Sequence, residues 1–397
     1  MRNALQETGW SKDTHKLPAA TMEELVRKKN EFLRISFAEV EKAFHVSLDK
    51  FDDKKIGYIE LAKGITRSLL RYDDCSFLLA QHVWKELQST YGLANEIKNL
   101  ALPYPIIHLP EDHSEIGPKH KDGYPYIDHF YTTWTPLNDC FHQPLSITEK
   151  THRKNGFVLR QLRSRIKFID RAILSTKKTL YPDIRLGEFF VWHGTTDHEG
   201  LLNKSGSTTT SIVLRFTSSP ILYDVALPCA DLEKFIPENR KTDTTELAKK
   251  IISFFNAVDA HGKRNDDEKK PFGELSAEIE SEIKKWDLSP KEKKQFSFVL
   301  ALWAQRMDGK RNVSLFYLYS YFIARDNFYV FHKCITSVLH NYGKDATEKF
   351  INDTIASDFS TQMDYVIKSA VNLNREKLEG IKLNIPAEME LLKYRFE

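Results

Sequence analysis

The sequence predicts an α+β fold in which a β-rich core lies between two helical regions. Apolar residues recur at helical spacing before about residue 102, and they do so again after about residue 229. Between these regions, short runs of aromatic and β-branched residues are broken by glycine and proline, which is typical of strands. We therefore expect a helical N-terminal region packing on the core (1–102), the core itself (103–228) and a helical C-terminal extension (229–397).

The composition is that of a globular protein. Hydrophobic residues make up 41% of the 397 residues and charged residues 28%, which excludes wholesale disorder. No run approaches the ~20 apolar residues that a membrane span needs, and a net charge of +3 gives no reason to expect nucleic acid as a partner. The first sixteen residues lack the apolar segment of a secretion signal, and the four cysteines are scattered. These features predict a cytoplasmic protein with reduced thiols.

The N-terminal region is predicted to form three helices. Thr21 and Glu24 have the spacing of a capping box, which predicts a helix start at this position. Apolar residues then follow at helical spacing, namely Leu25, Phe32, Leu33, Val40 and Phe44. Further helices are predicted over residues 59–71 and 75–90.

The central region is predicted to be an antiparallel β structure. The candidate strands cover residues 104–110, 126–137, 144–148, 188–193 and 207–217. Strands at this spacing favour a double-sheet jelly roll, also called a double-stranded β-helix, over a parallel α/β sheet. Residues 151–180 interrupt them with a predicted helical insertion, which holds nine basic residues against one acidic residue, Asp170.

The C-terminal region begins with polar connections and continues as helices. Ser289, Pro290 and Glu292 together form a strong helix start, with a cap, a proline at the first position and a capping-box glutamate. Gly309 is predicted to end this helix. Further helices are expected over roughly 312–374.

Histidines point to a metal site in the β core. Eight of the fourteen histidines lie between residues 108 and 198. His120 and Asp122 are two residues apart at the head of a predicted strand, so their side chains share a face. A second imidazole is available from His193 or His198. Two histidines and one carboxylate form the facial triad of non-haem iron(II) oxygenases, which leaves three metal positions open.

Two segments resemble the phytanoyl-CoA dioxygenase-like family of 2-oxoglutarate/iron(II) oxygenases. In residues 186–216, Gly187, His198 and Asn203 match the spacing of that family's distal-histidine segment. KHKDGY (119–124) followed by TTWTPLND (132–139) resembles its proximal half. The resemblance covers about 103–217 and implies Fe(II) and 2-oxoglutarate as cofactors.

The resemblance also implies the metal ligands. They are His120, Asp122 and His198, which are then the catalytic residues as well. His193 follows Gly187 too closely for the family pattern, and its place at a strand end suits a role beside the metal or in a substrate pocket.

The chain departs from the family pattern at the expected co-substrate anchor. The family usually carries an arginine eleven residues after the distal histidine, where it grips the far carboxylate of 2-oxoglutarate. This chain has Thr209 there. Ser211 and Arg215 lie on the same predicted strand face as Thr209. One candidate anchor is therefore Arg215, if its side chain reaches back along the strand and the hydroxyls of Thr209 and Ser211 assist it. The alternatives are a cation from another strand, or a site that no longer binds the co-substrate.

The sequence therefore leaves three functions open. The first is a dioxygenase that hydroxylates or otherwise oxidises a small molecule in a biosynthetic pathway. The distal segment resembles bacterial members of carbohydrate or aminoglycoside pathways, which favours a sugar-containing substrate, and the basic insertion favours an anionic one. The second is a non-catalytic metal-binding relative that serves as a binding or structural protein. The third is a different metal enzyme on a cupin-like barrel that works without 2-oxoglutarate.

Overall fold

The structure is a computed structural model that divides the chain into two compact units, residues 1–220 with 226–244 and residues 221–225 with 245–397. None of the described helices is long and apolar enough to cross a membrane. The described residues are 5, 7–13, 17–93, 97–113, 119–122, 130–138, 145–152, 178–218, 226–235, 243–268, 270–309, 313–325, 328–357, 374 and 377–383. Most of the predicted basic insertion therefore lies outside the described residues.

The N-terminal helices of the first unit are α2 (Ala19–Phe44), α3 (Ile56–Arg71) and α4 (Asp74–Tyr91). The predicted capping box at the start of α2 is wrong. The helix begins three residues earlier, because Pro18 and not Thr21 is its N-cap residue, and Glu24 binds Arg27 instead of a backbone amide. A short 3-10 helix, η1 (Asp53–Lys55), precedes α3.

The strands of this unit form two antiparallel sheets, which confirms the predicted antiparallel arrangement. All five predicted segments contain a strand. The large sheet has the order β1-β7-β4-β9-β2-β10, and β3 also pairs with β9. Its strands are β1 (Trp10–Asp13), β2 (Asn99–Ala101), β3 (Tyr104–His108), β4 (Phe130–Pro136), β7 (Phe189–His193), β9 (Thr209–Thr217) and β10 (Ala226–Pro228). The small sheet consists of β6 (Thr179–Leu180), β5 (Leu145–Thr148) and β8 (His198–Gly200).

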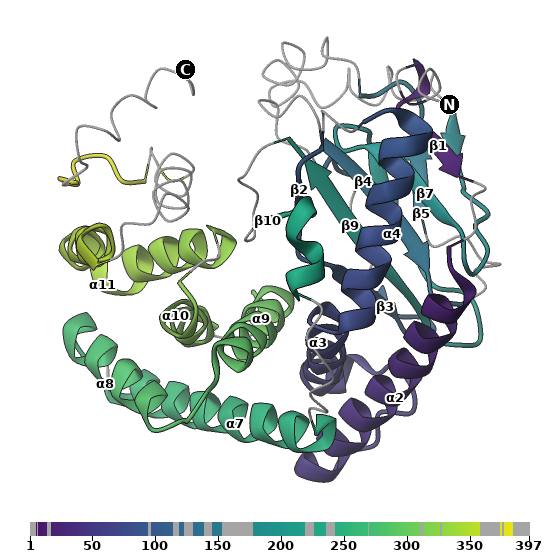
Figure 1. The fold of residues 1–397 in the computed structure, drawn as a ribbon. Helices are drawn as coiled ribbons and strands as arrows, with labels where there is room; N and C mark the ends of the chain where they lie inside the picture. The colour runs from purple at the N-terminus through teal and green to yellow at the C-terminus, as the bar shows by residue number, and fades with distance from the viewer. Residues whose placement is uncertain are drawn as a thin grey trace. The chain divides into compact units, whose positions relative to one another are not determined.

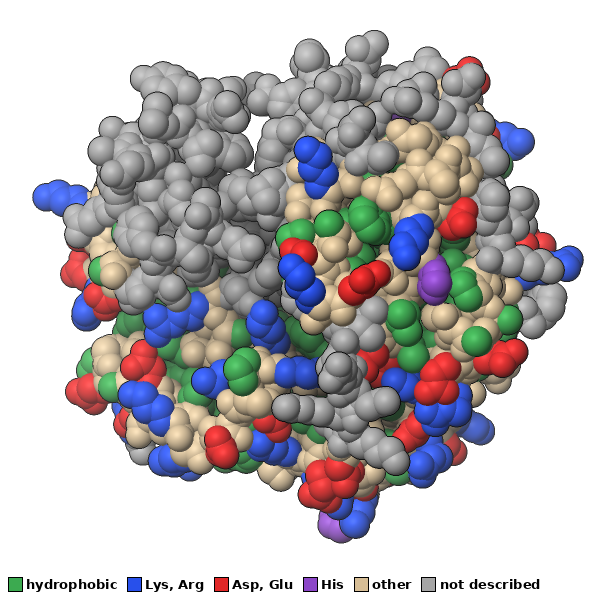
Figure 2. Space-filling view, viewed as in Figure 1, with side chains coloured by type: hydrophobic (Ala, Val, Ile, Leu, Met, Phe, Trp, Pro, Cys, Tyr) green, Lys and Arg blue, Asp and Glu red, His purple; other side chains and the backbone are tan. Residues whose placement is uncertain are grey.

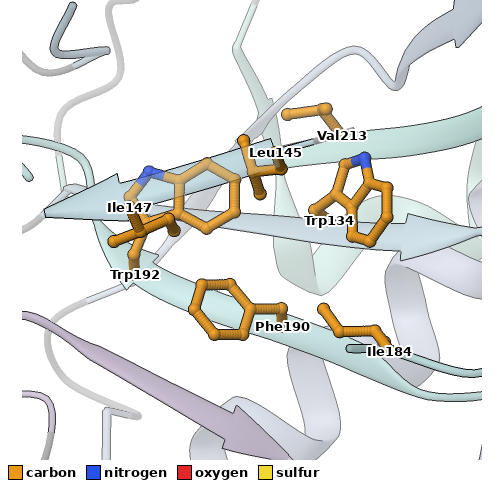
Figure 3. Packing of buried hydrophobic residues seen from close by; sticks show 7 residues of the cluster. All are labelled: Trp134, Leu145, Ile147, Ile184, Phe190, Trp192 and Val213. Atoms are coloured by element: carbon orange, nitrogen blue, oxygen red, sulfur yellow. The ribbon is translucent and has the colours of Figure 1, made fainter. Parts of the chain in front are cut away.

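A hydrophobic core joins the two sheets. Trp134, Phe190 and Val213 from the large sheet pack with Leu145 and Ile147 from the small sheet (Figure 3). Because side chains alternate along a strand, the odd-numbered residues of β9 face this core. The even-numbered residues of β9 are buried on the opposite face, on the side where α4 packs (Figure 1).

A buried ionic cluster ties α3 to the segment that leads into the predicted metal motif. Lys63 Nζ lies 2.8 Å from Glu60 Oε1 and 2.7 Å from Asp112 Oδ2, and all three side chains are fully buried. Asp112 lies four residues after β3 ends and eight residues before His120. The cluster therefore attaches the segment that follows β3 to α3.

The second unit is helical. Its helices are α7 (Thr244–Glu268), α8 (Phe272–Lys284), α9 (Pro290–Met307), α10 (Ser314–Ile323) and α11 (Phe328–Ser357). The predicted start of α9 is confirmed, because Ser289 and Glu292 form a reciprocal capping box. Gly309 follows the end of α9 with a φ of +80°, a left-handed conformation that glycine adopts readily. The part of the 312–374 prediction beyond Ser357 falls almost entirely outside the described residues.

The described surface carries charges of both signs. On the face shown in Figure 2, lysine and arginine side chains alternate with aspartate and glutamate. Some exposed charged side chains of the described residues pair within one helix, as Arg27 does with Glu24 and Glu31. Exposed pairs of this kind contribute little to stability, because water and salt screen the charges.

Candidate metal centre

The two predicted histidine ligands are held opposite each other by a backbone pair. His198 opens β8, and His120 forms an isolated antiparallel bridge with it. The amide of His120 donates to the carbonyl of His198 at 2.8 Å, and the amide of His198 donates back at 2.9 Å. Asp122 follows two residues later. The ligand atoms of the three side chains all lie within 4.8 Å of one another.

The distances in this His120–Asp122–His198 triad suit one divalent ion. Asp122 Oδ2 lies 3.5 Å from Nε2 of His198, and Asp122 Oδ1 lies 3.8 Å from Nε2 of His120. Two ligands at right angles on an ion with bonds of about 2.1 Å lie about 3 Å apart, so the triad needs only a small contraction. The side chain of His120 is 47% exposed and can make that movement.

The surroundings of Asp122 keep its carboxylate ionised and in place, as a metal ligand requires. Its carboxylate is buried and accepts hydrogen bonds at 3.0 Å from Thr132 Oγ1 on Oδ2 and at 3.0 Å from Arg215 Nη2 on Oδ1. Burial opposes its ionisation, but the adjacent positive charge of Arg215 holds the pKa of the Asp122 carboxyl well below its usual range. The carboxylate is therefore ionised and fixed from both sides.

His198 is held in the tautomer that a metal requires. Its Nδ1 lies 3.1 Å from the carbonyl oxygen of Thr196, and a carbonyl only accepts, so Nδ1 carries the proton. The lone pair is then on Nε2, the atom that faces Asp122. Burial also lowers the pKa of His198, which favours the neutral imidazole.

His193 lies outside the triad. It ends β7, and its Nδ1 lies 2.7 Å from Thr195 Oγ1, which itself donates to the carbonyl of His152 at 3.0 Å. Its neighbour Trp192 contributes to the core between the sheets, so alternation directs His193 to the other face of the strand. The structure thus brings His198, and not His193, to His120 and Asp122.

Sequence reasoning missed two residues of this centre, Thr132 and Trp192. Thr132 pairs with both Trp192 and Arg215 in the sheet register, which places the three side chains side by side. The Trp192 ring lies 5.1 Å from the His198 ring, and its buried Nε1 has no hydrogen-bond partner among the described residues. Both residues stand in motifs that the sequence singled out, but only the strand register reveals their proximity.

Asn203, which matched the family spacing, has a local structural role. Its Nδ2 donates at 2.9 Å to the carbonyls of His108 and Ser207, and its Oδ1 accepts from the amide of Ser205. These bonds close the turn between β8 and β9 and attach it to the end of β3. The asparagine therefore fixes the connection that follows His198.

The three predicted co-substrate residues do not converge on one point. Arg215 lies at the triad, with its guanidinium 5.6 Å from the ring centre of Tyr104. Thr209 is six residues away on β9, which corresponds to about 20 Å along a strand, and Ser211 is about 13 Å away. Thr209 pairs with His108, and its buried hydroxyl has no hydrogen-bond partner among the described residues. One carboxylate cannot contact all three side chains.

Neither a protein-family model nor a curated protein sequence matches the chain. Among solved structures, it is similar to the non-heme monooxygenase ThoJ in complex with nickel, at 15% identity and a TM-score of 0.39 over 67% of this chain and 98% of that one. It is also similar to SnoK, a non-heme α-ketoglutarate-dependent carbocyclase from nogalamycin biosynthesis, at 13% identity and a TM-score of 0.32 over 57% and 84%. A third is EctD from S. alaskensis with bound Fe, at 13% identity and a TM-score of 0.32 over 54% and 75%. These values are too low to transfer an activity to this chain.

Proposed function

We propose that the chain is an Fe(II)/2-oxoglutarate-dependent dioxygenase that hydroxylates or otherwise oxidises a small molecule. The triad of His120, Asp122 and His198 carries this proposal, because two imidazoles and one carboxylate on a β scaffold suit iron(II) and leave three positions open. We further propose that the two sheets form a jelly-roll core built mainly from residues 103–228, to which the N-terminal region 1–102 adds β1 and β2, and that residues 229–397 form a helical extension.

The side chains around the triad have separate tasks. When bound, iron and 2-oxoglutarate supply the activation of oxygen. Asp122 contributes the negative charge, His198 presents a neutral imidazole with Nε2 free for the metal, and the exposed His120 closes the set. Trp192 and the core beneath it exclude water from one side, and the buried indole N–H offers a donor to an oxygen atom of a bound ligand.

The substrate is proposed to be a sugar-containing or anionic small molecule, which rests on the distal-segment resemblance and on the basic composition of 151–180. We also propose that the protein acts in the cytoplasm. Cys75, Cys229 and Cys334 are free thiols, and each is buried, as expected for a protein of a reducing compartment.

One observation favours a second candidate, a metal-binding relative without catalytic activity. Thr209 stands where the resemblance implies a cation, and the nearest charged residue on the same strand face, Arg215, is bound to Asp122. A protein of this kind binds a divalent metal through the same triad but does not turn over 2-oxoglutarate.

The two candidates are separated by measuring the conversion of 2-oxoglutarate to succinate. Wild-type protein is loaded anaerobically with Fe(II), exposed to oxygen with 2-oxoglutarate, and assayed alone and with a panel of sugars and sugar phosphates. A dioxygenase forms succinate in an iron-dependent way, and Asp122→Ala abolishes the reaction. Iron binding without any succinate under all these conditions supports the non-catalytic relative.

A further inference from the structure

Arg215 is a fourth member of the metal centre. Its Nη2 lies 3.0 Å from Oδ1 of Asp122, and its side chain is 25% exposed while that of Asp122 is 6% exposed. The Tyr104 ring lies against the guanidinium. A full positive charge thus contacts the carboxylate that would bind the metal.

This contact compensates the charge of a buried carboxylate. An ionised carboxylate removed from water is costly unless a cation or several hydrogen bonds stabilise it. Thr132 supplies one neutral hydrogen bond to Oδ2, and Arg215 supplies the charge. A divalent ion bound at the triad would supply that charge instead, and it would also be repelled by the guanidinium across a short distance.

On the metal site of the proposed function, we propose that Arg215 is the counter-ion of Asp122 whenever no metal is bound. In this role Arg215 stabilises the metal-free protein and lowers the affinity of the triad for a divalent metal. The alternative role is to position Asp122 for the metal, in which case removing Arg215 weakens binding. The hydrogen bond from Thr132 to Asp122 allows these two roles of Arg215 to be distinguished. It holds Oδ2 at 3.0 Å independently of Arg215, so the carboxylate keeps its place when only the charge is removed.

The test is a calorimetric titration of Mn²⁺ into the metal-free full-length protein, without 2-oxoglutarate or substrate. Arg215→Met removes the charge, Arg215→Gln removes it but keeps a donor to Asp122, and Arg215→Lys keeps the charge. Both neutral variants should bind Mn²⁺ on the order of tenfold more tightly than wild type, as expected for the loss of a nearby positive charge. Arg215→Lys should resemble wild type, and so should Arg325→Met, a control in the helical unit where Arg325 pairs with Glu280.

Thermal unfolding provides the second readout. The neutral variants should unfold at a lower temperature than wild type without metal, and the difference should shrink with saturating Mn²⁺. Equal or weaker Mn²⁺ binding by whichever neutral variant folds overturns the inference and leaves the metal site intact. Failure of the wild type to bind Mn²⁺ overturns the metal site and this inference together, whereas absence of succinate formation bears only on the catalytic proposal.

Discussion

Replacing His198 with alanine should abolish the stabilisation of the protein by metal, whereas replacing His193 should not. His198 is one of the three proposed ligands, with its Nε2 3.5 Å from Asp122, and it is buried. His193 instead ends β7 in contact with Thr195. Each variant removes one imidazole, and the two positions are only five residues apart, so each variant is the matched control for the other.

The size of the effect follows from binding linkage. A metal that binds only the folded state stabilises it by about 2.7 kcal/mol at a concentration 100-fold above its dissociation constant. For a unit of 150–250 residues, each kcal/mol shifts the unfolding midpoint by about 2–4 °C, which gives a metal-induced shift of about 5–11 °C. His198→Ala should show a shift close to zero, and His193→Ala should show the wild-type shift.

The assay is differential scanning calorimetry of the full chain with and without Mn²⁺. The quantity compared is the metal-induced shift of each variant, because His198→Ala also loses ring contacts with Trp192 and His120 that lower the midpoint without metal. A wild-type shift in His198→Ala, together with a lost shift in His193→Ala, would refute the assignment of the ligands.

Three further predictions concern residues around and beyond the centre. Lys63→Met should lower the free energy of unfolding of the first unit by about 3–5 kcal/mol, because it removes a positive charge that contacts two fully buried carboxylates, Glu60 and Asp112; urea denaturation measures this, and a loss below about 1 kcal/mol would contradict the ionic anchor. Trp192→Phe should leave Mn²⁺ affinity unchanged but weaken anaerobic 2-oxoglutarate binding by about 3–10-fold, the effect of one hydrogen bond; unchanged 2-oxoglutarate affinity would mean that the indole N–H does not contact this ligand. Burial lowers the pKa of His261, which is hydrogen-bonded to Glu278, so the unfolded chain binds the proton more readily and the helical unit should lose stability as the pH falls below about 6.5. His261→Phe should reduce this pH dependence of the urea midpoint, and an identical dependence in both proteins would assign it to other groups.

The strands and most helices were predictable because their signals are local. The aromatic and β-branched run of 207–217 contains β9, and the cap at Ser289 starts α9 as expected. The predicted start of α2 was wrong because the spacing of Thr21 and Glu24 fits a capping box, whereas the helix already begins at Ala19, after Pro18.

The centre itself was only partly predictable. The spacing of His120 and Asp122 and the resemblance around His198 identified three side chains that the structure brings together. Their neighbours depend on register between distant strands. Thr132 lies opposite both Arg215 and Trp192 only because β4 pairs with β9 and β7 in that alignment, which no local pattern encodes.

The same limit applies to the predicted co-substrate anchor. Alternation places Thr209, Ser211 and Arg215 on one face of β9, but it gives no position along the strand relative to the triad. The contact between Arg215 and Asp122 comes from residues 93 positions apart in the chain. Only the fold reveals that Arg215 lies at the triad while Thr209 lies toward the far end of the strand.

The most direct measurement for the central claim is anomalous diffraction from crystals grown anaerobically with Fe(II). We predict one iron peak about 2.0–2.2 Å from Nε2 of His120, Nε2 of His198 and a carboxylate oxygen of Asp122, a range typical of divalent metal–ligand bonds. Iron bound at His193 in place of His198, or no iron peak at these three residues, would contradict the account.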